Sequence, residues 1–245
     1  MVRILFVGAG GTGGCFGGRL VEAGCDVTFL VREKRAVQLR SDGLVIKSSL
    51  GNFSGKVEFV TLSELEASFD VIVLSCKAYD LASVVSDLKG RLSQAAYLLP
   101  LLNGLAHYEE LDFRFGRERV MGGLCHIGVS LSEHGEVLHN NSSQLFTFGA
   151  RDPAQQASCE LLHEELLRAN FDAKLSTNII QDVWEKYVML TAYAATTCLM
   201  QSSIIVAARV AVRFCLKRLR SAAKSQFTTS MVRPDISQSH HRYAY

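Results

Sequence analysis

The chain has 245 residues, of which 48% are hydrophobic and 20% charged, with a formal net charge of +2 at pH 7; this is typical of a globular protein with a large core, in one large domain or two smaller ones. No apolar run reaches the length of about 20 residues that a membrane-spanning helix needs, and the first one enters a glycine turn, so we expect neither a membrane span nor a signal peptide. The seven cysteines are scattered and never spaced as a zinc site, which favours reduced thiols, no bound metal and a cytoplasmic location.

The first elements form a strand, a glycine turn, a helix and a second strand. Residues 4–7 are an apolar run that predicts the first strand, and residues 27–31 predict the second, which is closed by Arg32. The turn between the first strand and the helix contains Gly8, Ala9, Gly10, Gly11, Thr12 and Gly13. This order of elements is the one in which a GxGxxG sequence binds a dinucleotide.

Each glycine of the pattern has its own physical role. Gly8 permits the tight turn, Gly10 lets the backbone approach a pyrophosphate, and Gly13 lets the helix pack closely on the strand. The phosphates would bind the free N–H groups at the helix N-terminus. A turn that binds nothing, a flavin site and a methyl-donor site are the alternatives to a nicotinamide dinucleotide.

The residue at the end of the second strand indicates which dinucleotide is bound. NAD enzymes usually have Asp or Glu there, which accepts hydrogen bonds from the ribose, whereas this chain has Arg32. A guanidinium suits a 2′-phosphate, so we expect NADPH. The alternatives are NAD, or an Arg32 that lies on a solvated loop beside Glu33.

The pattern continues as alternating strands and helices up to about residue 177. The expected strands are residues 44–47 and 56–60 around the turn Gly51-Asn52, then 71–74, 97–102, 120–130, 136–139, 144–148 and 174–175. Residues 133–135 indicate a hairpin. Helices are expected at 80–92 and at 153–170, the latter with Asp152 as N-cap. From residue 178 the pattern is helical throughout, so we predict a Rossmann-like, doubly wound α/β domain over 1–177 and a helical domain over 178–245.

Three polar residues stand where such a fold binds its ligands. Lys77 and Asn103 each follow an apolar strand, at the edge that the glycine turn also occupies, and Lys186 lies in the first helix of the second domain. Each has a simpler explanation, because a lone lysine is usually a solvated charge and Asn-Gly is usually only a turn.

Four separated motifs together resemble the ketopantoate reductase (2-dehydropantoate 2-reductase) family, over residues 1 to about 203. They are Gly8 to Gly14 continuing through Phe16-Gly17-Gly18-Arg19-Leu20, then Cys76-Lys77-Ala78-Tyr79-Asp80-Leu81, Pro100-Leu101-Leu102-Asn103-Gly104 and Trp184-Glu185-Lys186. The resemblance implies NADPH-dependent reduction of 2-dehydropantoate, a small 2-oxo acid, to pantoate, a step toward pantothenate and coenzyme A.

The resemblance also assigns roles to residues. The turn from Gly8 to Gly13 and Arg32 would hold NADPH, while Lys77 and Asn103 would lie where nicotinamide and substrate meet. Lys186 would be the catalytic acid, because an ammonium can stabilise the charge that hydride transfer leaves on a ketone oxygen and can deliver the proton. Gly128 matches a position where the backbone approaches the cofactor, and Ser230, within Thr229-Ser230-Met231, matches a substrate-binding segment.

The chain departs from the family beyond Lys186. Many members have asparagines one and two helical turns after the catalytic lysine, where this chain has Leu190 and Ala194, so those hydrogen bonds to substrate cannot form. An acidic residue expected about a dozen positions after Ser230 is absent, and family members continue past Tyr245. We therefore expect residues from about Ile204 onward to be divergent, truncated or misread, which leaves the helical domain incomplete.

The C-terminal segment is basic. Residues 201–245 contain eight Lys or Arg and one acidic residue, and removing these from totals of 26 and 24 leaves residues 1–200 with a net charge of −5. Basic residues at helical spacing among apolar ones favour an amphipathic surface helix over a nucleic-acid or membrane contact. An incomplete domain would leave apolar residues such as Val188 and Leu199 less covered, so a homodimer is also among the expected assemblies.

Two classes of function remain open at this point. The first is an NADPH-dependent reductase of 2-dehydropantoate or of another 2-oxo acid. The second is a nucleotide-binding protein that has lost its substrate site and has little or no turnover.

Overall fold

The computed structural model describes residues 1–66, 68–203 and 206, and it divides into two compact units. The first unit is Met1–Val188 and the second begins at Met189. Helix α6 (Ile179–Met200) starts in the first unit and supplies most of the described part of the second. The domain boundary at residue 177 stays a prediction.

The first sheet is fully parallel, with the strand order β5-β2-β1-β6-β7. Its strands are β1 (Ile4–Val7), β2 (Val27–Leu30), β5 (Glu58–Val60), β6 (Val71–Leu74) and β7 (Tyr97–Pro100). Every residue of β1 and β6 is buried, as expected for central strands that are covered on both faces.

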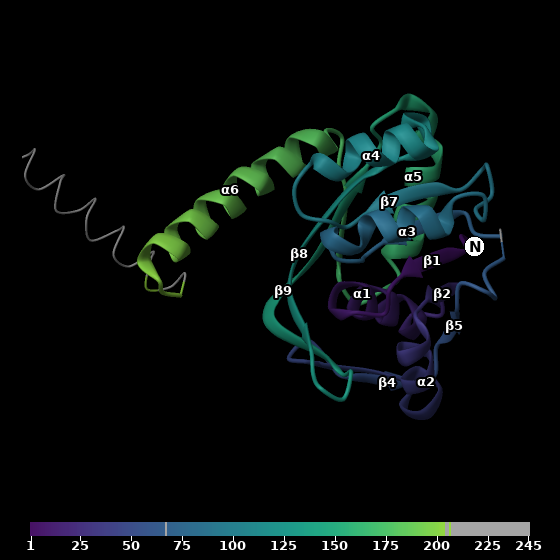
Figure 1. Ribbon diagram of the computed structural model, residues 1–245, viewed down its shortest axis with the longest axis horizontal. Helices are drawn as coiled ribbons and strands as arrows, with labels where there is room; N and C mark the ends of the chain where they lie inside the picture. The colour runs from purple at the N-terminus through teal and green to yellow at the C-terminus, as the bar shows by residue number, and fades with distance from the viewer. Residues whose placement is uncertain (67, 204–205, 207–245) are drawn as a thin grey trace, which may run out of the picture. The chain divides into compact units, whose positions relative to one another are not determined.

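Helices cover both faces of this sheet (Figure 1). Helix α1 (Gly11–Glu22) packs on the face that presents Phe6 and Val73. Helices α3 (Leu81–Leu88) and α4 (Ala106–Phe115) pack on the opposite face. The remaining connections include α2 (Glu33–Asp42) and the 3-10 turns η1 (Ala78–Asp80), η2 (Arg117–Arg119) and η3 (Pro153–Gln155).

A second, mixed sheet lies on the far side of α1. Its path is β10-β9-β3-β4, and β8 pairs with β9 as a long antiparallel hairpin. The strands are β3 (Leu44–Ser48), β4 (Phe53–Gly55), β8 (Gly122–Leu131), β9 (Val137–Gly149) and β10 (Asp172–Leu175), and α5 (Gln156–Leu166) precedes β10. One core joins Phe6 of the first sheet, Phe16 of α1 and Phe146 of the second sheet.

Helix α1 fits between the two sheets because it carries glycine where they approach. A β-carbon at Gly17 would lie 2.6 Å from the ring of Phe29, and one at Gly18 would lie 2.6 Å from Ile46. At Gly13 a β-carbon would collide with the carbonyl oxygen of Gly8. Contacts this short do not occur at real β-carbons, so the backbone of α1 is itself the packing surface.

The predicted fold class is confirmed: a doubly wound parallel sheet with helices on both faces is followed by helix. Several details were wrong. Residues 56–60 do not pair with 44–47, because Phe53–Gly55 takes that place and Glu58–Val60 joins the first sheet. The predicted strands 136–139 and 144–148 are one continuous strand, since both halves pair with β8.

Helix ends were also misplaced. The helix expected at 80–92 runs only over Leu81–Leu88, and the helix expected at 153–170 is a 3-10 turn followed by Gln156–Leu166. Helix α4 was not predicted. Its weak apolar pattern explains the omission, because its buried face consists of only His107, Tyr108 and Leu111, of which one is aliphatic.

Membrane spans and metal clusters are both absent from the part of the chain that the structure describes. No helix there combines the length and apolarity that crossing a bilayer requires. The same residues contain no group of three or more His, Cys, Asp or Glu side chains placed to bind a metal ion. Their six cysteines are all free thiols.

The glycine packing of α1 makes a stability prediction. Gly13→Ala adds a β-carbon against the carbonyl of Gly8, and we expect the free energy of unfolding to fall by about 1–3 kcal/mol. Gly10→Ala is the matched control, because a β-carbon there meets nothing within 4 Å, and losing a favoured N-cap residue should cost less than about 1 kcal/mol. Urea unfolding of the two variants would measure the difference, and equal losses would contradict the packing argument.

Candidate active site

Four of the residues singled out in the sequence lie at one edge of the first sheet. Gly8 follows β1, Arg32 follows β2, Lys77 follows β6 and Asn103 follows β7. Because these strands are parallel neighbours, their carboxyl ends share this edge. Open parallel sheets bind ligands in the crevice at this edge.

The glycine turn is held from the neighbouring strand. Gly8 has φ = +101°, which favours glycine, and its amide donates a hydrogen bond to the carbonyl of Leu30 at 2.9 Å. The hydroxyl of Ser75 lies 2.9 Å from the carbonyl oxygen of Val7 and 3.2 Å from that of Gly8. The sequence reasoning missed Ser75, although its place directly after β6 is a usable signal.

The N-terminus of α1 has the features of a phosphate site. Gly10 is the N-cap in an extended conformation without a side-chain cap, and the first helical hydrogen bond runs from Gly14 N to Gly10 O at 2.7 Å. The N–H groups of Gly11, Thr12 and Gly13 therefore precede the intrahelical ladder. No acidic residue lies in the first turn, and the space over Gly10 is open, so the turn fits an anion.

Arg32 lies at this edge but already has a partner. Its Nη2 is 2.8 Å from Oδ1 of Asp80, and about three quarters of the Arg32 side chain is exposed. Since β2 and β6 flank β1, the ion pair joins the loops on either side of the glycine turn. This contact with Asp80 could not be read from the motifs.

Lys77 and Gly128 differ in their contacts. The exposed side chain of Lys77 makes no hydrogen bond or ion pair with the described residues. Gly128 lies at an irregularity of β8, and its amide donates to Oδ1 of Asn141 at 2.9 Å. The next residue, Val129, would contact a β-carbon at Gly11 at 3.1 Å, so this part of β8 lies beside the N-terminus of α1.

Lys186 forms hydrogen bonds with residues at this edge of the sheet. Its Nζ donates to Oδ1 of Asn103 at 2.9 Å and to the carbonyl oxygen of Cys125 at 2.6 Å. An ammonium has three N–H donors, so within the described residues one donor remains for another acceptor. The structure thus brings together Lys186 and Asn103, which are 83 positions apart, and adds the backbone of Cys125.

Burial shapes the electrostatics around this lysine. It lowers the pKa of Lys186, while the nearby thiol of Cys125 acts in the opposite direction. Burial, followed by the Lys186 charge, also lowers the pKa of His126, whose Nδ1 is buried without a partner among the described residues. Both acceptors of Lys186 are neutral oxygens, so the site keeps an unneutralised positive charge.

Three further positions bear on substrate binding in the sequence, namely Ser230, Leu190 and Ala194. Ser230 lies outside the described residues. Leu190 and Ala194 belong to the second unit, on α6. Their apolar side chains offer no hydrogen bond to a ligand.

Residues 4–153 match the model of the family described as ketopantoate reductase PanE/ApbA. An uncharacterized oxidoreductase of Bacillus subtilis, YkpB, is 42% identical over 200 residues, which are 82% of this chain and 66% of the relative. A 2-dehydropantoate 2-reductase of Archaeoglobus fulgidus is 28% identical over 197 residues, covering 80% of this chain and 64% of the relative. The chain thus spans slightly less than two thirds of the length of these relatives.

A solved structure has the same architecture. The crystal structure of 2-dehydropantoate 2-reductase from Geobacter metallireducens superposes with a TM-score of 0.74 at 27% identity. The superposition covers 82% of this chain and 66% of that one.

The partly buried lysine makes a titration prediction. We expect the Lys186 amine to titrate below its ordinary value of 10.5, because burial disfavours the charged form. NMR titration of reductively ¹³C-methylated protein would measure this, and the signal would be assigned by its loss in Lys186→Arg. A midpoint at or above 10.5 would contradict the burial of the amine.

Proposed function

The chain belongs to the ketopantoate reductase PanE/ApbA family of oxidoreductases, and on that premise we propose that it is an NADPH-dependent reductase of a small 2-oxo acid. The reaction proposed first is reduction of 2-dehydropantoate to pantoate, in the formation of pantothenate and coenzyme A. The observation that carries the proposal is the contact of Lys186 with Asn103 at the edge where the glycine turn lies. This contact places a candidate proton donor, Lys186, beside the edge where the nucleotide would bind.

The residues suit the chemistry of ketone reduction. NADPH would supply the hydride to the carbonyl carbon. Lys186 would direct its remaining N–H at the carbonyl oxygen, stabilise the negative charge that develops there and give up a proton. Asn103 and the Cys125 carbonyl orient the ammonium without neutralising it, and its lowered pKa makes it a better acid.

NADPH is proposed over NADH because of Arg32. The open space over Gly10 and the uncapped start of α1 would take the pyrophosphate of either dinucleotide. The exposed guanidinium of Arg32 would bind the 2′-phosphate that only NADPH carries. Its ion pair with Asp80 would hold it at the edge before the nucleotide arrives.

A different 2-oxo acid is the second candidate substrate. Leu190 and Ala194 stand where many family members have substrate-binding asparagines, so a more apolar 2-oxo acid would suit these positions better. If Ser230 contributes to the site, it would bind a substrate hydroxyl or carboxylate. A protein that binds NADPH without turnover is the remaining alternative.

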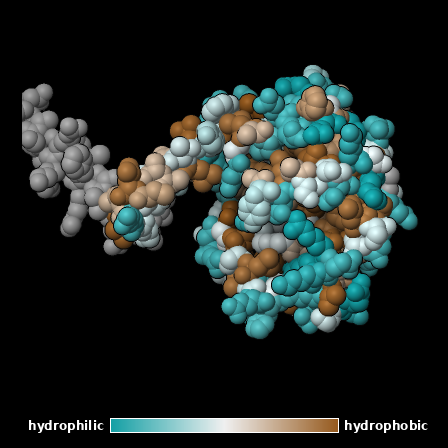
Figure 2. Space-filling view, in the orientation of Figure 1, coloured by the Kyte–Doolittle hydropathy of each residue, from teal (hydrophilic) through white to brown (hydrophobic). Residues whose placement is uncertain are grey.

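Assembly and location are part of the proposal. Apolar side chains are exposed on α6, among them Val188 and Leu199, and Figure 2 shows brown patches along this helix. Such patches favour association, which supports a homodimer that sedimentation analysis would test. The free thiols of the described residues support a cytoplasmic location. The proposal includes no nucleic-acid or membrane partner.

The proposed role of Lys186 is tested by its removal. Lys186→Ala should lower the rate of NADPH oxidation with 2-dehydropantoate by at least about 100-fold, because the proton donor is lost, while the Kd for NADPH stays the same. Lys174→Ala is the control, since that exposed lysine pairs with Asp182 away from the edge. A panel of 2-oxo acids would be assayed alongside. Unchanged turnover in Lys186→Ala would remove the lysine from the mechanism, and tight NADPH binding without turnover in the wild-type protein would favour the non-catalytic alternative.

The cofactor preference is tested at Arg32. Arg32→Asp should weaken NADPH binding by about 10-fold or more and leave NADH binding nearly unchanged, because a charge-assisted hydrogen bond to the 2′-phosphate is lost. Lys34→Asp makes the same change of charge two residues away, at another exposed side chain, and should have little effect. Fluorescence titration with each nucleotide would measure both. A preference for NADPH that survives in Arg32→Asp would contradict the assignment.

A further inference from the structure

A second arginine, Arg35, reaches the glycine turn from α2. Its Nε donates to the carbonyl oxygen of Ala9 at 3.1 Å, and its Nη1 donates to the carbonyl oxygen of Gly135 at 2.8 Å. Ala9 lies between the first two glycines of the turn, whereas Gly135 lies in the loop that joins β8 and β9. One side chain therefore ties the turn to the tip of the long hairpin.

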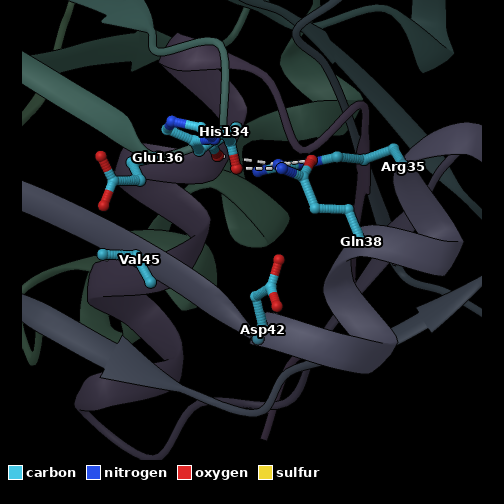
Figure 3. A pocket seen from close by; sticks show the side chains of 8 residues that line it. Arg35, Gln38, Asp42, Val45, His134 and Glu136 are labelled. Carbon is cyan, nitrogen blue, oxygen red and sulfur yellow. Dashed lines mark hydrogen bonds between the residues drawn. The ribbon is translucent and has the colours of Figure 1, made fainter.

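A neighbouring glutamine, Gln38, contacts the hairpin and Arg35. Nη1 of Arg35 also donates to Oε1 of Gln38 at 2.7 Å, and Nε2 of Gln38 donates to the carbonyl oxygen of His134. These side chains line a pocket of about 160 Å³, and Figure 3 shows Arg35 and Gln38 reaching from α2 toward His134. Gln38 makes no hydrogen bond to the turn among the described residues, so the two side chains differ in what they hold.

The charge of Arg35 is not needed to hold the hairpin. No carboxylate lies within 4.0 Å of its guanidinium among the described residues, and its Nη2 is buried without a partner there. Burying a cation without a counter-charge is costly, and a neutral amide such as that of Gln38 can hold a loop carbonyl at less cost. The free-energy cost of burying this guanidinium is explained if Arg35 also holds the glycine turn, through its hydrogen bond to Ala9, in a conformation that binds a ligand.

We propose that Arg35 is a positioning residue for the dinucleotide: by holding the carbonyl of Ala9, it fixes the turn in the orientation that points the N–H groups of Gly10 to Gly13 at the pyrophosphate. The proposal deepens the proposed function and rests on its nucleotide site. The two arginines then act on different parts of the dinucleotide. Arg32 would bind the 2′-phosphate, which only NADPH has, and Arg35 would position the turn that binds the pyrophosphate, which NADPH and NADH share.

The experiment measures nucleotide binding without substrate. NADPH and NADH are titrated by fluorescence into the full chain carrying Arg35→Gln, Arg35→Lys or Gln38→Ala, with thermal midpoints recorded. Arg35→Gln should raise both Kd values by a similar factor of about 10, the loss of one charged hydrogen bond. Arg35→Lys, which keeps a charged donor, should recover part of the affinity. Gln38→Ala removes the bond to the hairpin and one acceptor of Arg35 but leaves the hydrogen bond from Arg35 to Ala9, so it should change either Kd by less than about 3-fold.

Turnover adds a second readout. With saturating substrate, Arg35→Gln should raise KM for NADPH and leave kcat unchanged, because the turn is misplaced only until nucleotide occupies it. A general loss of structure would lower both the thermal midpoint and kcat.

Each contrary outcome has a distinct meaning. A loss confined to NADPH would show that Arg35 contacts the 2′-phosphate and would overturn the positioning role, as would unchanged binding in Arg35→Gln. An equal loss in Gln38→Ala would assign the effect to the hairpin. A wild-type chain that binds neither nucleotide would overturn the proposed function itself, whereas binding by the wild type with no effect at Arg35 would overturn this inference alone.

Discussion

The close approach of helix α1 to two sheets is the constraint on which the rest of the structure depends. Gly13 lies against the carbonyl of Gly8, Gly14 against Val137 and Gly18 against Ile46, so the helix backbone itself fills the space between the sheets. Side chains on those faces would push the sheets apart, because a packed interior tolerates little added volume. The same packing places the N-terminus of α1 between the edge of the first sheet and the β8–β9 hairpin. The position of the proposed nucleotide site is therefore a consequence of how the core is packed.

The elements that could be predicted from the sequence are those whose structure depends on residues close to them in the chain. The strand, turn and helix from residue 4 to residue 22 are contiguous, and their glycines have local reasons to be there. The second sheet could not be predicted in the same way. Ile46 pairs with Val137 across some ninety positions, and nothing near either residue specifies the other. Residues 56–60 show the difficulty. A local hairpin with residues 44–47 was predicted, but Glu58–Val60 pairs in parallel with β2.

The same distinction between local and distant interactions applies to the candidate site. Lys77, Asn103 and Lys186 could be found because each follows a strand or matches a motif, but their partners could not. The carbonyl of Cys125 carries no side-chain signal, although it holds Lys186 at 2.6 Å. Ser75 and Arg35 act on the glycine turn through backbone carbonyls, and any strand-end serine or helix-start arginine would look the same in the sequence. Hydrogen bonds to the backbone leave almost no trace in residue patterns.

Arg32 and Lys186, the two cations assigned to the proposed ligand site, are compensated differently. Arg32 is exposed and paired with the carboxylate of Asp80, which suits its proposed exchange of this anion for a 2′-phosphate. Lys186 is partly buried and held by neutral oxygens, so its full charge is available to the oxygen that becomes negative in the proposed reaction. A carboxylate partner would have cancelled that charge and raised the pKa of the amine, which would make it a poorer acid. The neutral partners of Lys186 thus suit the proton transfer proposed for it, whereas the carboxylate partner of Arg32 suits the binding role proposed there.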